Sequence, residues 1–572
     1  MDRVQIAAIV LAVGILLFWY SSVQKSPPPT ARAPVPAESP PSYPSEAEAE
    51  PPPPASSRTR ADDALPVAAV LTQARSSLLE NDELQVDVSH LGGRLRSVRL
   101  LDYADRLGPE ARPVELVTEP ERGTLLVFLG DGPFQGLESA EHELVRSGST
   151  ELTLRVRRDG VTVTRTLTLD PHGFGGRLRV RVDNGANKPV RPLFQLALSG
   201  RERPASAPDH FQNYGLVVSS DGSLVRRPLS SKSPFGCAGG GNGAEKRMPA
   251  PVEWGGLDSQ YFLLAAIPED PSRVSAAQAP LGELAARTVL SYPPIEVPPG
   301  AYVERTYRLY LGPKVQERVV EIDPRLTPAV RTGWVWVRPL VNLFVAMLSW
   351  TYANLIPNYG VAIILLTILV RVLTAPLTYR SMKSMRGMSV LAPEMKALQD
   401  KYKDDRARLQ QEMMSLYRRR GINPLTAMGG GCLPMLIQMP FLLALYFALQ
   451  SSIELRHAPF VFWIRDLSAP EDFLSIAGVP IRPLPLLMGV SMVLQQRLTP
   501  TSATADPSQR QMMMWMSVFF IFIFYSFPAG LVLYWFVSNI LAIAQQVWMN
   551  RGAAGGEGGA EAGGRGRGSG RS

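Results

Sequence analysis

One arginine within an apolar stretch is the residue of this sequence with the clearest chemical potential. Arg371 lies inside residues 359–378, which read YGVAIILLTILVRVLTAPLT. As a helix, these roughly 20 residues reach across the hydrocarbon of a bilayer. A lone charge at mid-bilayer costs from roughly 3 to more than 10 kcal/mol, so we expect a wet, protein-lined cavity around the guanidinium and a functional role for it. In the alternative interpretation, the helix ends near Val370 and Arg371 reaches the cytosolic headgroups.

A glycine-rich stretch is a second candidate for chemistry. Residues 233–246 contain GCAGGGNGAEK, but the G-x-x-x-x-G-K-[ST] order of phosphate-binding loops is absent, and Pro249 follows where a helix would begin. We therefore predict a flexible loop. The two cysteines, Cys237 and Cys432, form neither a disulfide framework nor a zinc-ligand spacing.

Two neighbouring pairs, His142–Glu143 and Asp209–His210, have the residue types of acid/base catalysts. Each pair stands alone in the sequence, which makes a catalytic centre the weaker interpretation. The five histidines lack H-E-x-x-H or H-x₃-H spacing. We expect no metal, no cofactor and no enzymatic activity.

Composition divides the 572 residues into unlike parts, because 45% hydrophobic residues with a mean hydropathy near zero is an average of soluble and membrane sections. Residues 1–25 predict an uncleaved signal-anchor helix, since no small-x-small cleavage site follows the apolar run. Residues 26–60 contain twelve prolines and predict an extended linker that buries no core.

Residues 61–330 alternate between apolar and polar side chains in short runs. Residues 152–157 and 161–169 flank Asp159-Gly160, which predicts two strands joined by a turn that accepts positive φ. Residues 177–182 and 303–311 continue the pattern. Strands with one apolar face predict a half-buried antiparallel sheet, and many of them predict a large all-β sandwich. Because it follows the outer end of the anchor, we expect it to be extracytoplasmic.

Residues 331–548 predict a polytopic helical core, with six membrane-spanning helices when the anchor is included. The final apolar stretch is divided at Pro528-Ala529-Gly530. The predicted segments are an interfacial helix at 334–352, spans at 359–378, 433–450, 480–498, 512–527 and 530–548, and a helical hairpin at 382–420, followed by a flexible, glycine-rich basic tail at 549–572.

The distribution of charge predicts the orientation. From Arg371 to Gly431 there are twelve Lys/Arg against five Asp/Glu, which places this segment in the cytosol. Alternation from the anchor agrees and puts both termini in the cytosol. The net charge of +8 is thus concentrated at a membrane surface, so we predict no specific DNA binding. Within the hairpin, Met385, Met395 and Tyr402 belong to one heptad-like seam and Met413 to a second.

Several long motifs occur in one order: the arginine-bearing segment ILLTILVRVLTAPLT, QQEMMSLYRRRGINPL at 410–425, GGCLPMLIQMPFLLALYFAL at 430–449, IELRHAPFVFWIRDLS at 453–468, and DPSQRQMMMWM followed by FPAGLVLYWFVSN at 506–539. In these residues the sequence resembles the YidC/Oxa1/Alb3 membrane insertase family, in its Gram-negative YidC form. The resemblance covers about 330–548 closely, and the anchor and sandwich by architecture.

The resemblance implies a helical bundle around a hydrophilic groove, open to the cytosol and to lipid. It implies that the substrate groove is lined by Arg371, Thr367, Gln438, Tyr534 and Trp535. The residues expected to contact substrate leaving between the third and fifth helices are Met435, Met439, Phe441, Met514 and Phe519. The implied partners are nascent inner-membrane proteins, the phospholipid bilayer, the Sec translocon and the ribosome.

We therefore expect a membrane protein insertase and chaperone of the bacterial inner membrane that uses no nucleotide. A secondary transporter or channel with an arginine anion site is the alternative, but the sequence shows one membrane-buried ionisable residue and no paired repeats. A structural assembly factor without insertion activity is a third interpretation.

Overall fold

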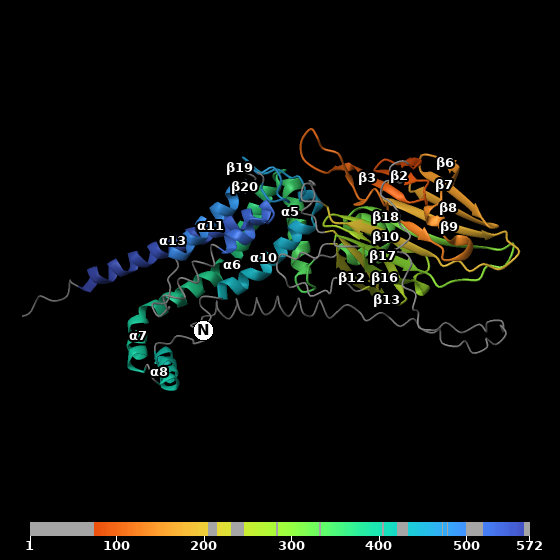
Figure 1. Cartoon of the computed structure of the whole chain (residues 1–572). Helices are drawn as coiled ribbons and strands as arrows, with labels where there is room; N and C mark the ends of the chain where they lie inside the picture. The colour runs from red at the N-terminus through yellow and green to blue at the C-terminus, as the bar shows by residue number, and fades with distance from the viewer. Residues whose placement is uncertain are drawn as a thin grey trace, which may run out of the picture. The chain divides into compact units, whose positions relative to one another are not determined.

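The computed structural model describes residues 74–203, 214–229, 245–281, 284–330, 333–402, 405–419, 433–471, 473–476, 479–498 and 519–564. Side chains are not described for residues 380–390, 392, 396, 406, 433–437, 475, 476, 479 and 550–564. The predicted anchor and linker at 1–60 lie outside these ranges, as do Asp209-His210, most of the glycine-rich loop and Met514. Figure 1 shows the two kinds of structure that remain, a strand-rich part and a helical part.

The strand-rich part is the predicted all-β domain. Its largest sheet has nine strands in the order β12-β11-β14-β15-β18-β9-β8-β7-β6, and its ladders are antiparallel. The strands are β6 Glu143–Ser147, β7 Glu151–Arg158, β8 Val161–Leu169, β9 Gly175–Asn184, β11 Gly215–Ser220, β12 Ser223–Pro228, β14 Val252–Asp258, β15 Phe262–Pro268 and β18 Tyr302–Pro313.

Two smaller antiparallel sheets complete this domain. One has the order β13-β16-β17-β10-β5 and the other β1-β2-β3-β4. Their strands are β1 Ser76–Glu80, β2 Leu84–Ser89, β3 Leu95–Ala104, β4 Pro113–Glu115, β5 Leu126–Phe128, β10 Gln195–Arg201, β13 Lys246–Met248, β16 Ser275–Pro280 and β17 Ala285–Ser291.

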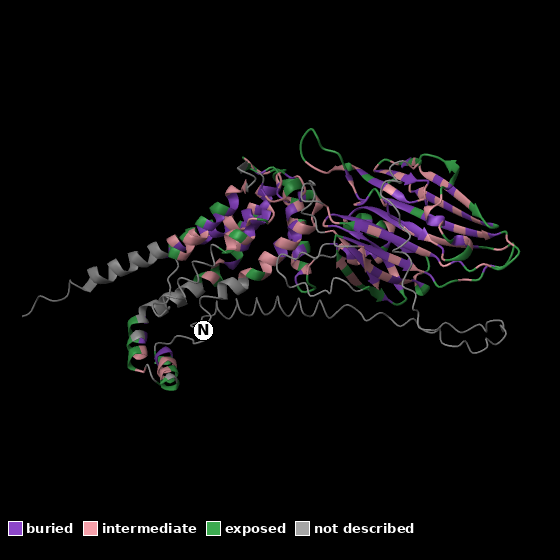
Figure 2. Ribbon diagram, viewed as in Figure 1, coloured by how far each residue is buried: buried purple, intermediate pink, exposed green. Residues whose placement is uncertain are grey.

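Alternation in sequence becomes alternation of burial. Along β8, every second residue is buried and those between are partly exposed, as the purple and pink bands of Figure 2 indicate. The turn before it has Asp159 at φ 49° and Gly160 at φ 78°, so the predicted positive-φ hairpin is confirmed. The inward faces, with Trp254, Tyr307 and Tyr310 among the largest side chains, form one continuous apolar core.

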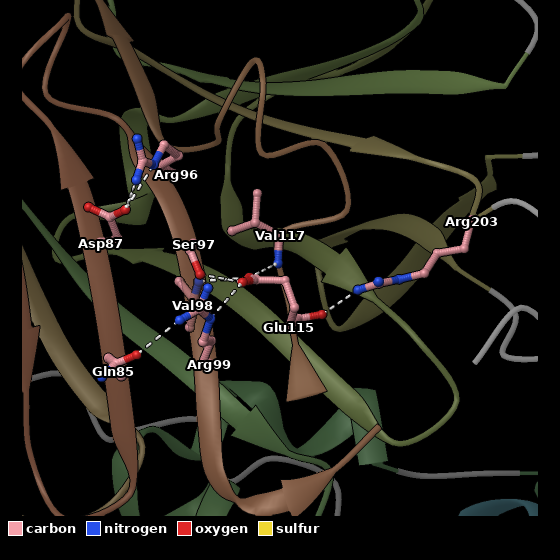
Figure 3. A network of polar contacts seen from close by, with 9 residues as sticks. All are labelled: Gln85, Asp87, Arg96, Ser97, Val98, Arg99, Glu115, Val117 and Arg203. Carbon is pink, nitrogen blue, oxygen red and sulfur yellow. Dashed lines mark hydrogen bonds and ion pairs between the residues drawn. The ribbon is translucent and has the colours of Figure 1, made fainter. Parts of the chain in front are cut away.

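A partly buried carboxylate joins β4 to β3. Glu115 accepts hydrogen bonds from the backbone N–H of Val98 at 2.7 Å and of Val117 at 2.9 Å, and from the hydroxyl of Ser97. Arg203 donates to the backbone carbonyl of Glu115 (Figure 3). Burial raises the pKa of Glu115, and these donors oppose that shift. These side-chain hydrogen bonds of Glu115 add to the few backbone hydrogen bonds that the three-residue strand β4 can form.

The helical part begins after β18. Its helices are α3 Gln316–Ile322, α4 Thr327–Val330, α5 Arg338–Asn354, α6 Tyr359–Val390, α7 Ala392–Lys401, α8 Arg406–Arg419, α10 Leu433–Ser451, α11 Pro483–Leu498 and α13 Ala529–Gly564, with a two-stranded hairpin of β19 Leu474–Ile476 and β20 Val479–Ile481. Residues 519–524 are also helical. Helices α5, α6, α10, α11 and α13 share an apolar core that includes Phe344, Ile363, Leu445, Met488 and Leu531.

Four boundaries differ from the sequence prediction. The predicted span at 480–498 begins later, because residues 479–481 form strand β20 and helix α11 starts at Pro483. Helix α6 continues beyond the predicted span to Val390, and a new helix, α7, begins at Ala392 with Pro393 in its first turn, where the missing N–H of proline costs no helical hydrogen bond. Helix α5 begins at Arg338, not 334, with Pro339 in its first turn. Helix α13 continues to Gly564, into the predicted flexible tail, although the seven glycines of residues 549–564 disfavour helix.

Among the described helices, two are long and apolar enough to cross a bilayer, at Tyr359–Tyr379 and Ala529–Met549. Helix α10 has 19 residues, but α11 has 16 and reaches about 24 Å, which is less than the hydrocarbon thickness of about 30 Å. The total of six spanning helices therefore stays a prediction.

Candidate functional site

The guanidinium of Arg371 is held by a hydroxyl from another helix. Its Nε and Nη2 donate to Oγ of Ser538 on α13, at 2.8 and 2.5 Å. Arg371 is partly exposed, whereas its neighbours Val372 and Leu373 are 65% and 68% exposed. The apolar residues on the open side of α6 thus suit lipid, and the arginine turns toward α13. No carboxylate of a described residue forms an ion pair with it.

A second polar pair lies one helical turn earlier on α13. Tyr534 is 2% exposed, and its hydroxyl accepts a hydrogen bond from Nε2 of Gln438 on α10. Tyr534 and Ser538 are four residues apart and therefore share a face of α13. This face of α13 therefore carries Tyr534 and provides the hydrogen-bond partners of Gln438 and Arg371. All three were predicted to line a groove.

The other two predicted groove residues have different surroundings. Thr367 is fully buried, and its hydroxyl donates to the carbonyl of Ile363 on its own helix at 2.6 Å. Trp535 packs its ring against Phe520 and Phe524, with centroids 5.9 and 5.0 Å away. It therefore belongs to an aromatic cluster with the helical residues 519–524.

Sequence reasoning missed the remaining polar contacts of α13. Asn539 donates to Ser491 on α11 at 3.0 Å, and Gln546 donates to the carbonyl of Leu498 at 2.8 Å. Gln545 donates to the carbonyl of Ala375 on α6 at 3.4 Å. The signal was present as polar residues at spacings of four and seven along an apolar helix, at 534, 538 and 545 and at 539 and 546.

The predicted exit residues are only partly described. Met439 is 36% exposed and Phe519 is 54% exposed. Phe441 is partly buried and stacks against Phe344 with ring centroids 6.5 Å apart. The side chain of Met435 and all of Met514 lie outside the described residues.

The predicted hairpin seam is found in part. Met395 on α7 and Leu416 and Tyr417 on α8 are buried together, with Leu398 and Met413 packed beside them. Asp405 begins the second arm, since its carboxylate accepts from the N–H of Arg408 at 3.0 Å.

The seam residue Tyr402 ends the first arm. It is partly exposed, and Lys401 lies 5.4 Å and Arg408 6.0 Å from the centre of its ring. The side chain of Met385 is not described. The two arms pack through fewer residues than the seams predicted, because the first arm, α7, has only ten residues and those before it belong to α6.

The histidine considered as an acid/base catalyst is a core residue. His142 is 2% exposed, and its Nδ1 donates to the carbonyl of Ala140 at 3.0 Å, while Glu143 lies on an exposed strand. Burial, together with the charge of Arg165, lowers the pKa of His142 to about 3. The imidazole of His142 is therefore neutral and buried, whereas the carboxylate of Glu143 lies in solvent. The two side chains are not arranged to transfer a proton to each other.

The chain combines apolar helices long enough to cross a bilayer, a large β domain and an arginine among apolar residues. These features define a class of polytopic membrane protein. Comparison with known proteins identifies the family. Residues 350–555 match the family described as 60Kd inner membrane protein, and residues 78–343 match the YidC periplasmic domain. The chain belongs to the YidC family of membrane protein insertases.

Individual relatives agree over almost the whole chain. The membrane protein insertase YidC of Geotalea daltonii is 33% identical, covering 96% of this chain and 99% of its own. That of Syntrophus aciditrophicus is 33% identical, covering 96% and 100%. A crystal structure of an active YidC insertase with its first transmembrane domain resolved shares 18% identity and covers 83% of this chain and 95% of its own, with a TM-score of 0.33.

Proposed function

We propose that this protein moves hydrophobic segments and short N-terminal tails of newly made inner-membrane proteins from the cytosol into the bilayer. The observation that carries the proposal is the geometry of Arg371, a partly exposed cation in an apolar span whose side-chain partner is an uncharged hydroxyl. Ser538 fixes the guanidinium in place without neutralising it. The charge therefore stays available to an acidic group that enters the membrane.

Insertion of this kind needs no nucleotide. Transfer of Leu, Ile, Phe and Val residues into lipid is favourable by a few tenths of a kcal/mol per residue, so the substrate supplies the driving force. The barrier is the polar tail, which meets a penalty of several kcal/mol in hydrocarbon. A hydrated groove with Arg371 shortens the dry distance and offers the tail a temporary partner.

The proposed route uses the parts in sequence. Substrate first contacts the basic helix pair α7–α8, which we place in the cytosol. Its tail then reaches Arg371, and its apolar segment leaves between α10 and residues 512–527, where Met439 and Phe519 are exposed. In this arrangement the β domain is periplasmic, both termini are cytosolic, and the Sec translocon and the ribosome are partners for some substrates.

Reconstitution tests the proposal directly. The purified chain is placed in liposomes, and insertion of a single-span protein with an acidic N-tail is measured by protease protection. The Arg371→Ala variant removes the cation, and Arg371→Lys keeps a charge without the planar guanidinium. Loss of about 1.4 kcal/mol of tail stabilisation slows insertion about tenfold, so we expect at least that for alanine and a smaller loss for lysine.

A substrate whose acidic tail residues are replaced by glutamine provides the matched comparison, because it should depend far less on Arg371. The lipid-facing Val372→Ala variant controls for disturbance of α6. Equal insertion of the acidic and neutral substrates by a stably folded Arg371→Ala protein would remove this mechanism. Release of a trapped anion by the wild-type chain, without insertion, would instead identify a channel or transporter.

A further inference from the structure

One face of the nine-stranded sheet carries a regular array of polar side chains that insertion does not use. Strands β7, β8, β9 and β18 pair in continuous register, so their alternate residues line up in rows across the sheet. The four rows are Glu151, Thr168, Arg177 and Arg308; Thr153, Thr166, Arg179 and Thr306; Arg155, Thr164, Arg181 and Glu304; and Arg157, Thr162, Asp183 and Tyr302. We call these residues the arginine–threonine face.

This face points away from the core. On β8 the threonines are partly exposed and the residues between them are buried, and on β9 Arg177 and Arg179 are exposed while Leu178 and Val180 are buried. Figure 2 shows buried residues alternating with partly exposed and exposed ones along β7, β8 and β9. With strands about 4.8 Å apart and same-face residues about 7 Å apart, the array covers about 14 by 20 Å and follows the twist of the sheet.

The face is positively charged. It contains six arginines and three carboxylates, a net charge of +3. Asp183 pairs with Arg181 at 2.6 Å and Glu304 pairs with Arg179 at 3.3 Å.

The third carboxylate does not neutralise the face. Glu151 pairs at 3.3 Å with Arg146, which is not one of its members. Arg155, Arg157, Arg177 and Arg308 form no ion pair with another described residue. Four guanidiniums on one face of the sheet therefore remain open to an anionic partner.

The residue types favour one class of anion. The face has one aromatic side chain, Tyr302, and no aliphatic one, whereas the centre of a protein interface is apolar and single-stranded nucleic acid needs several stacking aromatics. Guanidinium binds phosphate through paired N–H donors, and threonine hydroxyls supply further donors. We propose that the arginine–threonine face binds the anionic phospholipid headgroups of the bilayer that the chain's own helices span.

The connection of the β domain to the membrane supports this partner. Strand β18 ends at Pro313 and the apolar span of α6 begins at Tyr359, so the domain is permanently tethered close to a bilayer surface. Tethering makes the effective concentration of headgroups high, so weak contacts are enough. An array of this area, with its charges spread over four strands, also suits the many headgroups of a membrane surface better than it suits a single peptide. The proposal does not depend on the insertion mechanism.

Lipid-dependent quenching tests the proposal on the full chain. A fluorophore is attached at Thr166→Cys in a protein with Cys237→Ser and Cys432→Ser, and the protein is reconstituted in nanodiscs containing headgroup-labelled quencher lipid. We expect at least threefold stronger quenching with 30% phosphatidylglycerol than with phosphatidylcholine alone, and we expect the difference to shrink as salt is raised. The label at Ser272→Cys, on an exposed turn outside the face, should show no such difference.

Matched charge variants decide between specific and general attraction. Arg155→Gln with Arg157→Gln and Arg177→Gln should abolish the lipid-dependent difference. A control with the same change of charge elsewhere on the domain, Arg106→Gln with Arg112→Gln and Arg191→Gln, should retain it. Both variants should unfold at the same temperature as the wild type, which establishes that they are folded. Both should also insert substrate at the wild-type rate, which separates this site from the groove.

Three results would overturn the proposal. The first is equal quenching in both lipids, and the second is equal quenching of the two labels. The third is a response to a soluble polymer in place of lipid. Polyglutamate or an oligonucleotide would then change the fluorescence in phosphatidylcholine discs, while phosphatidylglycerol would have no effect. That result would identify an anionic polymer as the partner.

Discussion

Arg371 and Ser538 are 167 residues apart in the chain, and two nitrogens of the guanidinium share the one serine hydroxyl, at 2.8 and 2.5 Å. Arginine is a fork of donors, and serine is the smallest side chain with an acceptor oxygen. The pair ties α6 to α13 and keeps the positive charge uncompensated. The position of the cation therefore depends on α13 as much as on its own helix.

Removal of that hydroxyl should weaken the site without abolishing it. Ser538→Ala leaves two guanidinium donors without their partner, at a cost of about 1–3 kcal/mol, and lets the side chain move. We expect insertion of an acidic-tail substrate to slow several-fold, less than in Arg371→Ala. Initial rates in liposomes measure this, and Ser491→Ala, which removes a hydroxyl bonded to Asn539 instead, is the matched control. Wild-type rates in Ser538→Ala would show that the hydroxyl does not position the arginine.

The helix pair should act as a folded unit. Leu416 is 7% exposed in the contact between α7 and α8. Leu416→Asp places a charge in that contact, and we expect the two arms to separate and insertion to decrease. Limited proteolysis of residues 392–419 measures the separation. Gln411→Asp, on the exposed side of α8, changes the charge equally and should leave both readouts unchanged.

The β domain should lose stability when a buried indole is shortened. Trp254 is fully buried, and its Nε1 donates to the carbonyl of Arg325 at 2.8 Å. Trp254→Phe removes this hydrogen bond and leaves a small cavity, at a cost of about 2 kcal/mol. Denaturant unfolding followed by circular dichroism measures the change. Trp350→Phe, at a residue 60% exposed, should be neutral, and a similar loss in both variants would contradict the explanation.

Acid should destabilise the β domain through His142. Its pKa is lowered to about 3 in the folded protein by burial and by Arg165, against about 6.5 when unfolded. Below pH 6.5 the unfolded chain therefore binds the proton first, so stability falls as pH decreases toward 3, by at most about 1.4 kcal/mol per pH unit.

The matched variant isolates this histidine. His142→Asn can still donate to the carbonyl of Ala140 but does not titrate, so its stability should fall about 2 kcal/mol less than that of the wild type between pH 6.5 and pH 4.5. His90, whose pKa is also lowered by burial, contributes equally to both proteins. Parallel pH profiles of unfolding would show that His142 does not carry the effect.

The sequence by itself determined the division into an all-β domain and membrane helices, because each has its own hydrophobic period. Alternation at residues 161–169 and the apolar run at 359–378 are local patterns, and they predict the strand β8, which pairs with β7 and β9, and the helix α6. The motif around Arg371 likewise indicated the family, which the relatives confirm.

Tertiary structure alone decided which partner each polar residue has. Ser538, Asn539 and Gln545 are ordinary polar residues in the sequence, and only the packing of α13 against α6 and α11 gives them Arg371, Ser491 and the carbonyl of Ala375. Thr367, which shares a helix face with Arg371, is instead buried and bonded within α6. The physical reason is that a buried polar group must find a partner, and the choice among distant residues depends on helix packing, which local sequence does not encode.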